Sequence, residues 1–115
     1  MKLHDKVFVY GTLKSNFHAN HYLRNRSEFI DEDRIEGSLY TLGAFPGYKA
    51  EGSGMVSGEV YEITDEKLPD ILDSYEGYPS LYSRLKVRTE KGYTCWVYVI
   101  NQPMSETSLI EEGVW

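Results

Sequence analysis

The sequence is poor in cysteine, and this lack excludes a disulfide framework. Cys95 is the single cysteine in 115 residues, so no internal disulfide can form. The first residues, MKLHDKVFVYG, contain no apolar run of the length that a signal peptide requires. Both features favour a cytoplasmic protein over a secreted one.

Positive charge and long hydrophobic runs are also scarce. Twelve Lys and Arg residues stand against eighteen Asp and Glu residues, a net charge of -6, so no basic stripe is available to neutralise a phosphate backbone. The longest apolar runs, such as WVYVI, are far shorter than the about 20 residues of a membrane-spanning helix. We therefore expect neither nucleic acid nor a membrane as a partner.

The remaining features are those of one small folded domain. A chain of this length can bury roughly two-thirds of its unfolded surface around a single core. No linker, repeat or low-complexity tract divides it. We therefore treat residues 1–115 as a single domain, and the sequence leaves its oligomeric state open.

Alternating apolar segments predict five strands. Residues 6–10 form a β-branched and aromatic run that stops at Gly11, where the backbone can turn and expose its amides. Similar patterns predict strands over residues 34–42, 55–63, 83–89 and 93–100. The last two are separated by Glu-Lys-Gly, a hairpin signal, whereas a glycine-rich loop is expected over residues 45–54.

One segment, from about residue 65 to residue 76, predicts a helix. Its apolar residues have the spacing of a core-facing stripe: Leu68, Ile71, Leu72 and Tyr75. Three polar residues are expected on the opposite side: Asp70, Asp73 and Ser74. Pro69 belongs in a first turn, which predicts that the regular part begins late. A second, short helix is expected within residues 15–26.

These elements indicate an α+β fold. Strands without a repeating βαβ rhythm are typical of a small mixed β-barrel or curved sheet with helices packed outside. The last residues, 105–115, end in Trp115, and a terminal tryptophan favours a docked tail over a frayed one.

Glu76 is the residue of this helix that requires an explanation. At about 100° per residue it falls about 80° from Leu68, on the rim of the apolar stripe. Gly77 follows as a predicted C-terminal cap, so the carboxylate lies at the negative end of the helix dipole. Partial burial and this dipole both raise a carboxyl pKa. The alternative is that Glu76 merely accepts hydrogen bonds from a tyrosine or from backbone amides.

Four separated segments, in this order, carry a resemblance to a known family. They are VYGTL at residues 9–13, GEVYEI at 58–63, LDSYEG at 72–77 and LYSR at 81–84. From about Val7 to Val99 the chain resembles the γ-glutamylcyclotransferase-like family, which includes γ-glutamylamine cyclotransferases and AIG2-like proteins. The pairing of YGTL with the downstream LDxYEG and YxR is more specific than any single segment.

The resemblance implies a small mixed β-barrel with flanking short helices and a cavity at one end. It also implies release of 5-oxoproline from a γ-glutamyl compound, without metal or other cofactor, with Glu76 as the catalytic proton carrier. The substrate-binding residues carried over are Tyr10, Gly11, Thr12 and Leu13, and Tyr82 matches a tyrosine that borders the cavity. Ser15-Asn16-Phe17 departs from relatives that have a glycine here, which leaves the leaving group of the substrate open.

The chemistry suits these residues because the nucleophile in cyclotransfer is the α-amine of the substrate itself. The enzyme then needs a glutamyl clamp, donors for the oxyanion and one proton carrier, and no serine or cysteine nucleophile. Two alternatives stay open: a small-acid binding module of the same fold that has lost turnover, and a hydrolase or transferase that uses an external nucleophile.

Other candidate sites are weaker. His18 and His21 stand three residues apart, but no third metal ligand lies nearby in the sequence, so solvent-facing or packing histidines are favoured. Cys95 lies within a predicted strand with no apparent histidine partner, which favours a buried, inert thiol. Tyr78 is interpreted as a packing residue.

Overall fold

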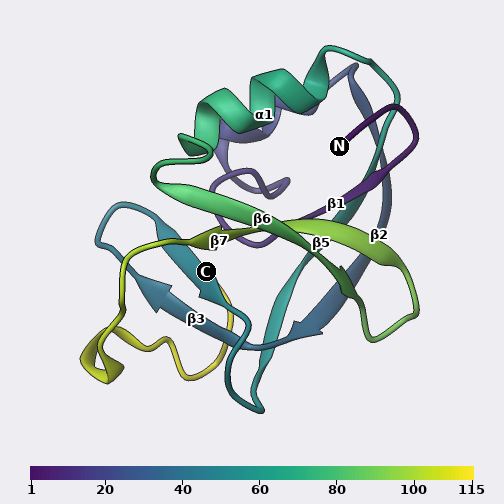
Figure 1. Ribbon diagram of the computed structural model, residues 1–115. Helices are drawn as coiled ribbons and strands as arrows, with labels where there is room; N and C mark the ends of the chain where they lie inside the picture. Colours follow the sequence, from purple (N-terminus) through teal and green to yellow (C-terminus); the bar gives the residue numbers. More distant parts are fainter.

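The computed structural model describes residues 1–115 and contains two β-sheets and one α-helix (Figure 1). The larger sheet has the order β2-β5-β1-β7-β6 and the smaller one pairs β3 with β4. The strands are β1 Lys6–Val9, β2 Ser27–Glu36, β3 Ser38–Thr41, β4 Pro46–Lys49, β5 Met55–Ile63, β6 Tyr82–Arg88 and β7 Thr94–Ile100. The helices are α1 Leu68–Glu76 and two 3-10 turns, η1 His18–Tyr22 and η2 Glu106–Ser108. The fold is a small mixed α+β fold, as expected from the sequence.

The predicted closed barrel is not confirmed. β2 and β6 are the two edges of the five-stranded sheet and do not pair with each other. The sheet instead curls until the β6–β7 turn reaches β2, where the Glu90 amide donates to the Arg34 carbonyl. One backbone hydrogen bond does not make a strand ladder, so the sheet is curved and open.

The two faces of this sheet bury separate apolar clusters. On one face α1 packs Leu68 and Leu72, both fully buried, against strand residues such as Val7 and Ile63. On the other face β3 and β4 contribute Leu39 and Tyr48 to a second cluster. Figure 1 shows α1 and β3 on opposite sides of the sheet.

Helix α1 forms where the apolar spacing predicted it and begins late, at Leu68, with Pro69 in its first turn. Gly77 ends it in the left-handed conformation (φ 67°, ψ 36°), where its amide bonds to the Ser74 carbonyl. An αL position favours glycine because a Cβ is strained there.

Three predictions from the sequence differ from the structure: one strand, one loop and one short helix. The strand expected over residues 34–42 is divided at Gly37 into the ends of β2 and β3, because its φ of 143° breaks the extended path. β4 lies in the segment predicted to be a glycine-rich loop. The helix expected within residues 15–26 is only the 3-10 turn η1.

The last residues pack onto the rest of the fold. The Ile110 amide donates to the Leu39 carbonyl, and the Ser57 amide donates to the Gly113 carbonyl. The side chain of Trp115 packs against the second cluster, and its backbone oxygen accepts from Lys14 Nζ at 3.0 Å. The segment expected to be a docked tail is therefore ordered against β3 and β5. The longest helix, α1, has nine residues, and none of the helices could span a membrane.

Candidate active site

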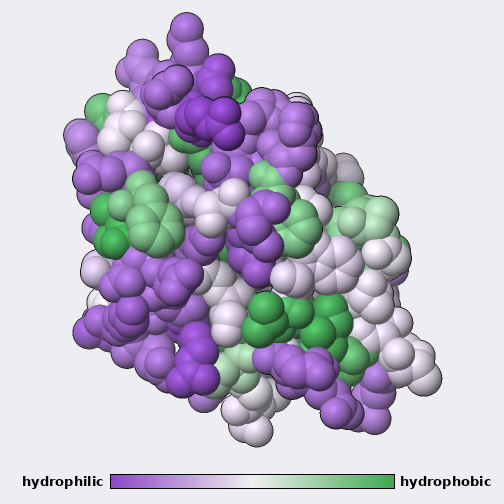
Figure 2. All heavy atoms as spheres, turned by 180° about the vertical axis from the view of Figure 1, so that it is seen from behind, coloured by the Kyte–Doolittle hydropathy of each residue, from purple (hydrophilic) through white to green (hydrophobic).

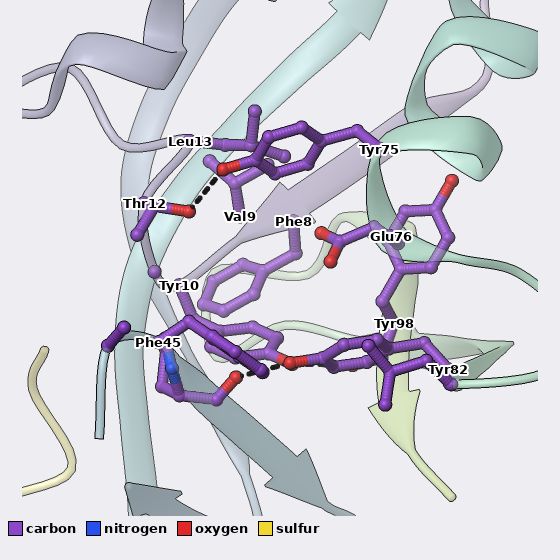
Figure 3. Close-up of a pocket in the computed structure, with 14 residues that line it drawn as sticks. Phe8, Val9, Tyr10, Thr12, Leu13, Phe45, Tyr75, Glu76, Tyr82 and Tyr98 are labelled. Carbon is purple, nitrogen blue, oxygen red and sulfur yellow. Dashed lines mark hydrogen bonds between the residues drawn. The ribbon is translucent and has the colours of Figure 1, made fainter. Parts of the chain in front are cut away.

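A cavity of about 310 Å³ opens where β1 ends, between the loop of residues 10–13, the last turn of α1 and the start of β4 (Figure 3). Ten of its fourteen lining residues are hydrophobic. Glu76 is the one lining residue with a charged side chain, and no Lys, Arg or His takes part. The cavity is thus a largely apolar space that contains a single carboxylate.

Six site residues are predicted from the sequence, and all of them line this cavity. They are Tyr10, Gly11, Thr12, Leu13, Glu76 and Tyr82. They come from the end of β1, from α1 and from β6, so the fold brings together three segments that are far apart in the sequence. Figure 3 shows the loop of residues 10–13 and Glu76 on facing sides of the cavity.

The loop of residues 10–13 presents unpaired backbone donors. None of its four amides donates a hydrogen bond to another protein group. The next amide, that of Lys14, closes a turn onto the Gly11 carbonyl at 3.0 Å. Buried backbone amides are normally paired, so consecutive free amides at a cavity wall can bind an anionic oxygen.

Gly11 allows this loop to pass close to β4. A Cβ at position 11 would lie 2.6 Å from Cγ of Pro46, which is too close for two carbon atoms. Beneath the loop, the buried Tyr10 hydroxyl accepts from the Tyr48 amide at 3.1 Å and donates to the Tyr98 carbonyl at 2.8 Å. The loop is therefore held in place by β4 and β7.

Glu76 is the last residue of α1, and its carboxylate points into the cavity (Figure 3). It accepts no hydrogen bond from a tyrosine or from a backbone amide, so the alternative stated from the sequence is not what the structure contains. Burial among apolar groups disfavours the charged form and raises the pKa of Glu76 to about 7. The carboxyl can therefore exchange a proton near neutrality.

Two tyrosines border Glu76 and have fixed hydroxyls. Tyr82 is buried, and its hydroxyl donates to the Pro46 carbonyl at 2.6 Å. Tyr75 is not the core anchor predicted from the helix pattern, since it is 38% exposed at the cavity mouth. Its hydroxyl lies 2.8 Å from Thr12 Oγ1 and ties α1 to the loop.

A polar cluster behind the cavity is not predicted from the sequence. Asp73, predicted to lie on the polar side of α1, accepts two hydrogen bonds from Arg84 at 2.9 and 3.0 Å and one from the Tyr98 hydroxyl at 2.7 Å. The Arg84 guanidinium also lies 4.2 Å from the centre of the Tyr78 ring, so Tyr78 packs there and not in the cavity. The YxR segment could be recognised in the sequence, but the contact of its arginine with Asp73 could not.

The remaining candidates lie outside the cavity. Burial raises the pKa of the Cys95 thiol to about 12, which leaves it protonated and unreactive near neutrality. The rings of His18 and His21 pack at 5.2 Å, and no group of three or more His, Cys, Asp or Glu side chains is arranged to hold a metal ion.

The fold and this cavity define a small α+β protein that carries one unpaired carboxylate opposite a loop of free amides. Residues 7–115 match the family described as "Gamma-glutamyl cyclotransferase, AIG2-like". The chain therefore belongs to the γ-glutamylcyclotransferase family, as the resemblance in the sequence implied.

Individual relatives support this assignment over the whole chain. The chain is 34% identical over 110 residues to the γ-glutamylcyclotransferase family protein YtfP of Escherichia coli K12, covering 96% of this chain and 95% of the relative. The solution structure of YtfP from Escherichia coli superposes with a TM-score of 0.76 at 33% identity, over 96% of this chain and 95% of that one. A crystal structure of a Pyrococcus horikoshii protein gives a TM-score of 0.78 at 26% identity, over 96% and 88%.

Proposed function

We propose that this protein is a γ-glutamyl cyclotransferase that releases 5-oxoproline from a γ-glutamyl amine or amino acid, with Glu76 as general acid and base. The observation that carries the proposal is the pairing of two features in one cavity. Glu76 has a pKa of about 7 and no protein partner, and it faces a loop whose four amides have no acceptor. Family membership supplies the reaction class.

The reaction balances without water. The α-amino nitrogen forms a bond to the γ-carbonyl carbon, and the bond from this carbon to the leaving nitrogen breaks. Glu76 takes a proton from the attacking nitrogen and returns it to the leaving nitrogen, so the products are 5-oxoproline and a free amine. A carboxyl with a pKa close to the working pH is suited to both transfers, which contribute roughly 10²- to 10⁴-fold in rate.

The loop of residues 10–13 binds the negative charge of the substrate in this proposal. Its free amides hold the α-carboxylate or the oxyanion that forms at the γ-carbon, and a single such donor contributes roughly 10²- to 10³-fold. Tyr82 narrows the cavity beside Glu76, so that the glutamyl chain folds back and places its amine against its own carbonyl.

Glu76→Gln tests the proposal because it removes the titrating group and keeps the shape. We expect 5-oxoproline release to fall by about 10²- to 10⁴-fold, while 5-oxoproline still raises the melting temperature. Glu66→Gln is the matched control, since Glu66 is exposed just before the other end of α1, and it should keep full turnover. Full turnover in Glu76→Gln would exclude Glu76 as proton carrier.

The same assay separates the alternatives. A binding module without turnover would be stabilised by γ-glutamyl compounds and form no product. A hydrolase with an external nucleophile would release free glutamate in place of 5-oxoproline.

A further inference from the structure

Buried charge is rare in this chain. The face of the molecule seen in Figure 2 is largely hydrophilic, with its hydrophobic residues in one compact patch and scattered spots. Only three charged side chains are buried: Lys14, Asp33 and Glu59. Glu59 is 7% exposed and forms no ion pair with a Lys, Arg or His side chain. Because a buried carboxylate is costly unless donors surround it, the donors to Glu59 indicate what it holds in place.

Glu59 lies on β5 beside both ends of the loop of residues 10–13. In the β1–β5 ladder it is the register partner of Val9, the residue just before the loop. Its carboxylate accepts from the Ser15 amide at 2.8 Å and from the Ser15 hydroxyl at 2.6 Å, and Ser15 is the second residue after the loop. Glu59 does not line the cavity. It therefore fixes the ends of the loop from outside the cavity.

Tyr61 and Asn20 connect Glu59 to the loop itself. The Tyr61 hydroxyl donates to Glu59 Oε1 at 2.9 Å and accepts from Asn20 Nδ2 at 3.1 Å. The same Asn20 nitrogen donates to the carbonyl of Leu13, the last residue of the loop, at 2.8 Å. A carbonyl can only accept and an amide nitrogen can only donate, so the direction of this chain of bonds is fixed. Glu59 thus holds the Ser15 amide directly and the Leu13 carbonyl through two side chains.

These bonds occupy two carbonyls of the loop and leave its amides free. The Leu13 carbonyl accepts from Asn20, and the Gly11 carbonyl accepts from the Lys14 amide at 3.0 Å. The amides of residues 10–13 donate to no protein group. Because a peptide group is planar, fixing the Leu13 carbonyl also fixes the Lys14 amide in the same plane, and with it the turn onto Gly11. The orientation of the free amides therefore depends on bonds made outside the cavity.

We propose that Glu59 is a positioning residue, which holds the loop of residues 10–13 so that its free amides face the substrate. It acts through the bonds described above, directly on Ser15 and by way of Tyr61. The inference rests on the proposed cyclotransferase reaction and adds no chemical step to it. Glu76 remains the proton carrier, whereas Glu59 touches neither the substrate nor the reacting atoms.

Glu59→Ala removes the acceptor at the centre of these bonds. We expect kcat/KM for 5-oxoproline release to fall roughly 10²-fold, because small displacements of binding groups have effects of this size. Asp33→Ala is the matched control, since Asp33 is buried to a similar extent, at 5% exposed, and accepts from the backbone amides of Arg34 and Lys91, away from the loop. It should keep kcat/KM near the wild-type value. A loss of kcat/KM no larger in Glu59→Ala than in Asp33→Ala would overturn the inference.

Two further readouts separate positioning from general disruption. Glu59→Gln keeps an acceptor oxygen for the Ser15 amide and the Tyr61 hydroxyl, so kcat/KM should recover to within about 10-fold of wild type. In Glu59→Ala the pH midpoint of Glu76 should stay near 7, because the burial that raises its pKa comes from the cavity itself. No recovery in Glu59→Gln, or a midpoint near the ordinary 4.5 in Glu59→Ala, would contradict a positioning role.

Tyr61→Phe carries the test if Glu59→Ala does not fold. It removes only the hydroxyl that connects Asn20 to Glu59, and we expect kcat/KM to fall about 10-fold. The backbone NMR signals of the amides of residues 11–13 should shift in this variant and stay in place in Asp33→Ala. Unchanged kcat/KM or unchanged loop signals in Tyr61→Phe would overturn the inference and leave the proposed reaction standing. If the wild-type protein itself released no 5-oxoproline, the proposed function would fail, and the inference with it.

Discussion

Asp73 and Glu76 lie three residues apart on α1, and their surroundings differ sharply. Asp73 accepts hydrogen bonds from Arg84 and Tyr98, whereas Glu76 accepts none. Burial raises the pKa of both groups, but at Asp73 the bonds from Arg84 and Tyr98 outweigh it and hold the pKa below its ordinary value. At Glu76 nothing opposes burial, and the pKa rises to about 7.

This difference separates two functions on one helix. A carboxyl with strong donors stays ionised and fixes structure, while a carboxyl without donors in an apolar cavity can gain and lose a proton near neutrality. Asp73 and Arg84 fasten the last turns of α1 to β6, and this contact positions Glu76 over the cavity. The ionised carboxylate of Asp73 thus helps to hold the protonatable carboxyl of Glu76 in place.

The largest loss of stability is expected when Asp73 loses the hydrogen bonds that Arg84 donates to it. Arg84→Met removes both guanidinium bonds and leaves a largely buried carboxylate with one donor, which should lower the free energy of unfolding at pH 7 by about 3 kcal/mol. Arg34→Met is the matched control, because its ion pair with Glu90 is about half exposed on both sides and should cost less than about 1 kcal/mol. Denaturant unfolding measures both, and equal losses would contradict the distinction between the two pairs.

Replacing the carboxyl at position 76 by an amide should stabilise the fold, and the gain should increase as the pH rises. Because the pKa of Glu76 is raised on folding from 4.5 to about 7, the unfolded chain releases its proton first as the pH rises. Wild-type stability therefore falls between about pH 4.5 and pH 7 and is lowest above it. Glu76→Gln lacks this loss, so its advantage should grow from near zero at pH 4 to as much as about 3 kcal/mol at pH 8.

Thermal or denaturant unfolding at the two pH values checks this gain. Glu76→Gln is thus expected to gain stability at pH 8 and to lose 5-oxoproline release, and both can be measured on the same protein. A constant difference between pH 4 and pH 8 would show that Glu76 titrates alike in the folded and unfolded chains.

A smaller effect is expected from Tyr98→Phe, which removes one donor to Asp73. A hydrogen bond to a charged group is worth about 1.5 kcal/mol or somewhat more. Since the pKa of Asp73 is lowered on folding, this contribution is present at neutral pH and is lost as the pH falls below the ordinary value of the carboxyl. Tyr82→Phe is the control, because its hydroxyl donates to the neutral Pro46 carbonyl and its loss should not depend on pH in the acidic range.

The elements that could be predicted from the sequence are those encoded by local patterns. The apolar spacing of α1, its late start at Pro69 and its end at Gly77 all depend on neighbouring residues. The β6–β7 hairpin depends on the turn between two alternating segments. Glu76 could be identified in the same way, since its position on the rim of the stripe follows from the helix period.

The features that could not be predicted depend on distant partners. β4 has only four residues, and the amide of its Tyr48 is bound by the Tyr10 hydroxyl from another part of the chain. Asp73 falls on the polar side of a helical wheel, and only the approach of β6 turns that side into a contact. The open edge of the sheet likewise depends on how far it curls, which no local pattern encodes.

Glu76 is the carboxyl of this helix that has no hydrogen-bond partner and a pKa near neutrality, and its site-specific titration is the decisive measurement. Carbon-13 NMR of the side-chain carboxyls, with Glu76→Gln used to assign the Glu76 signal, follows that group from pH 3 to pH 9. We expect the Glu76 carboxyl to titrate with a midpoint near 7. A midpoint near the ordinary glutamate value of 4.5 would contradict it.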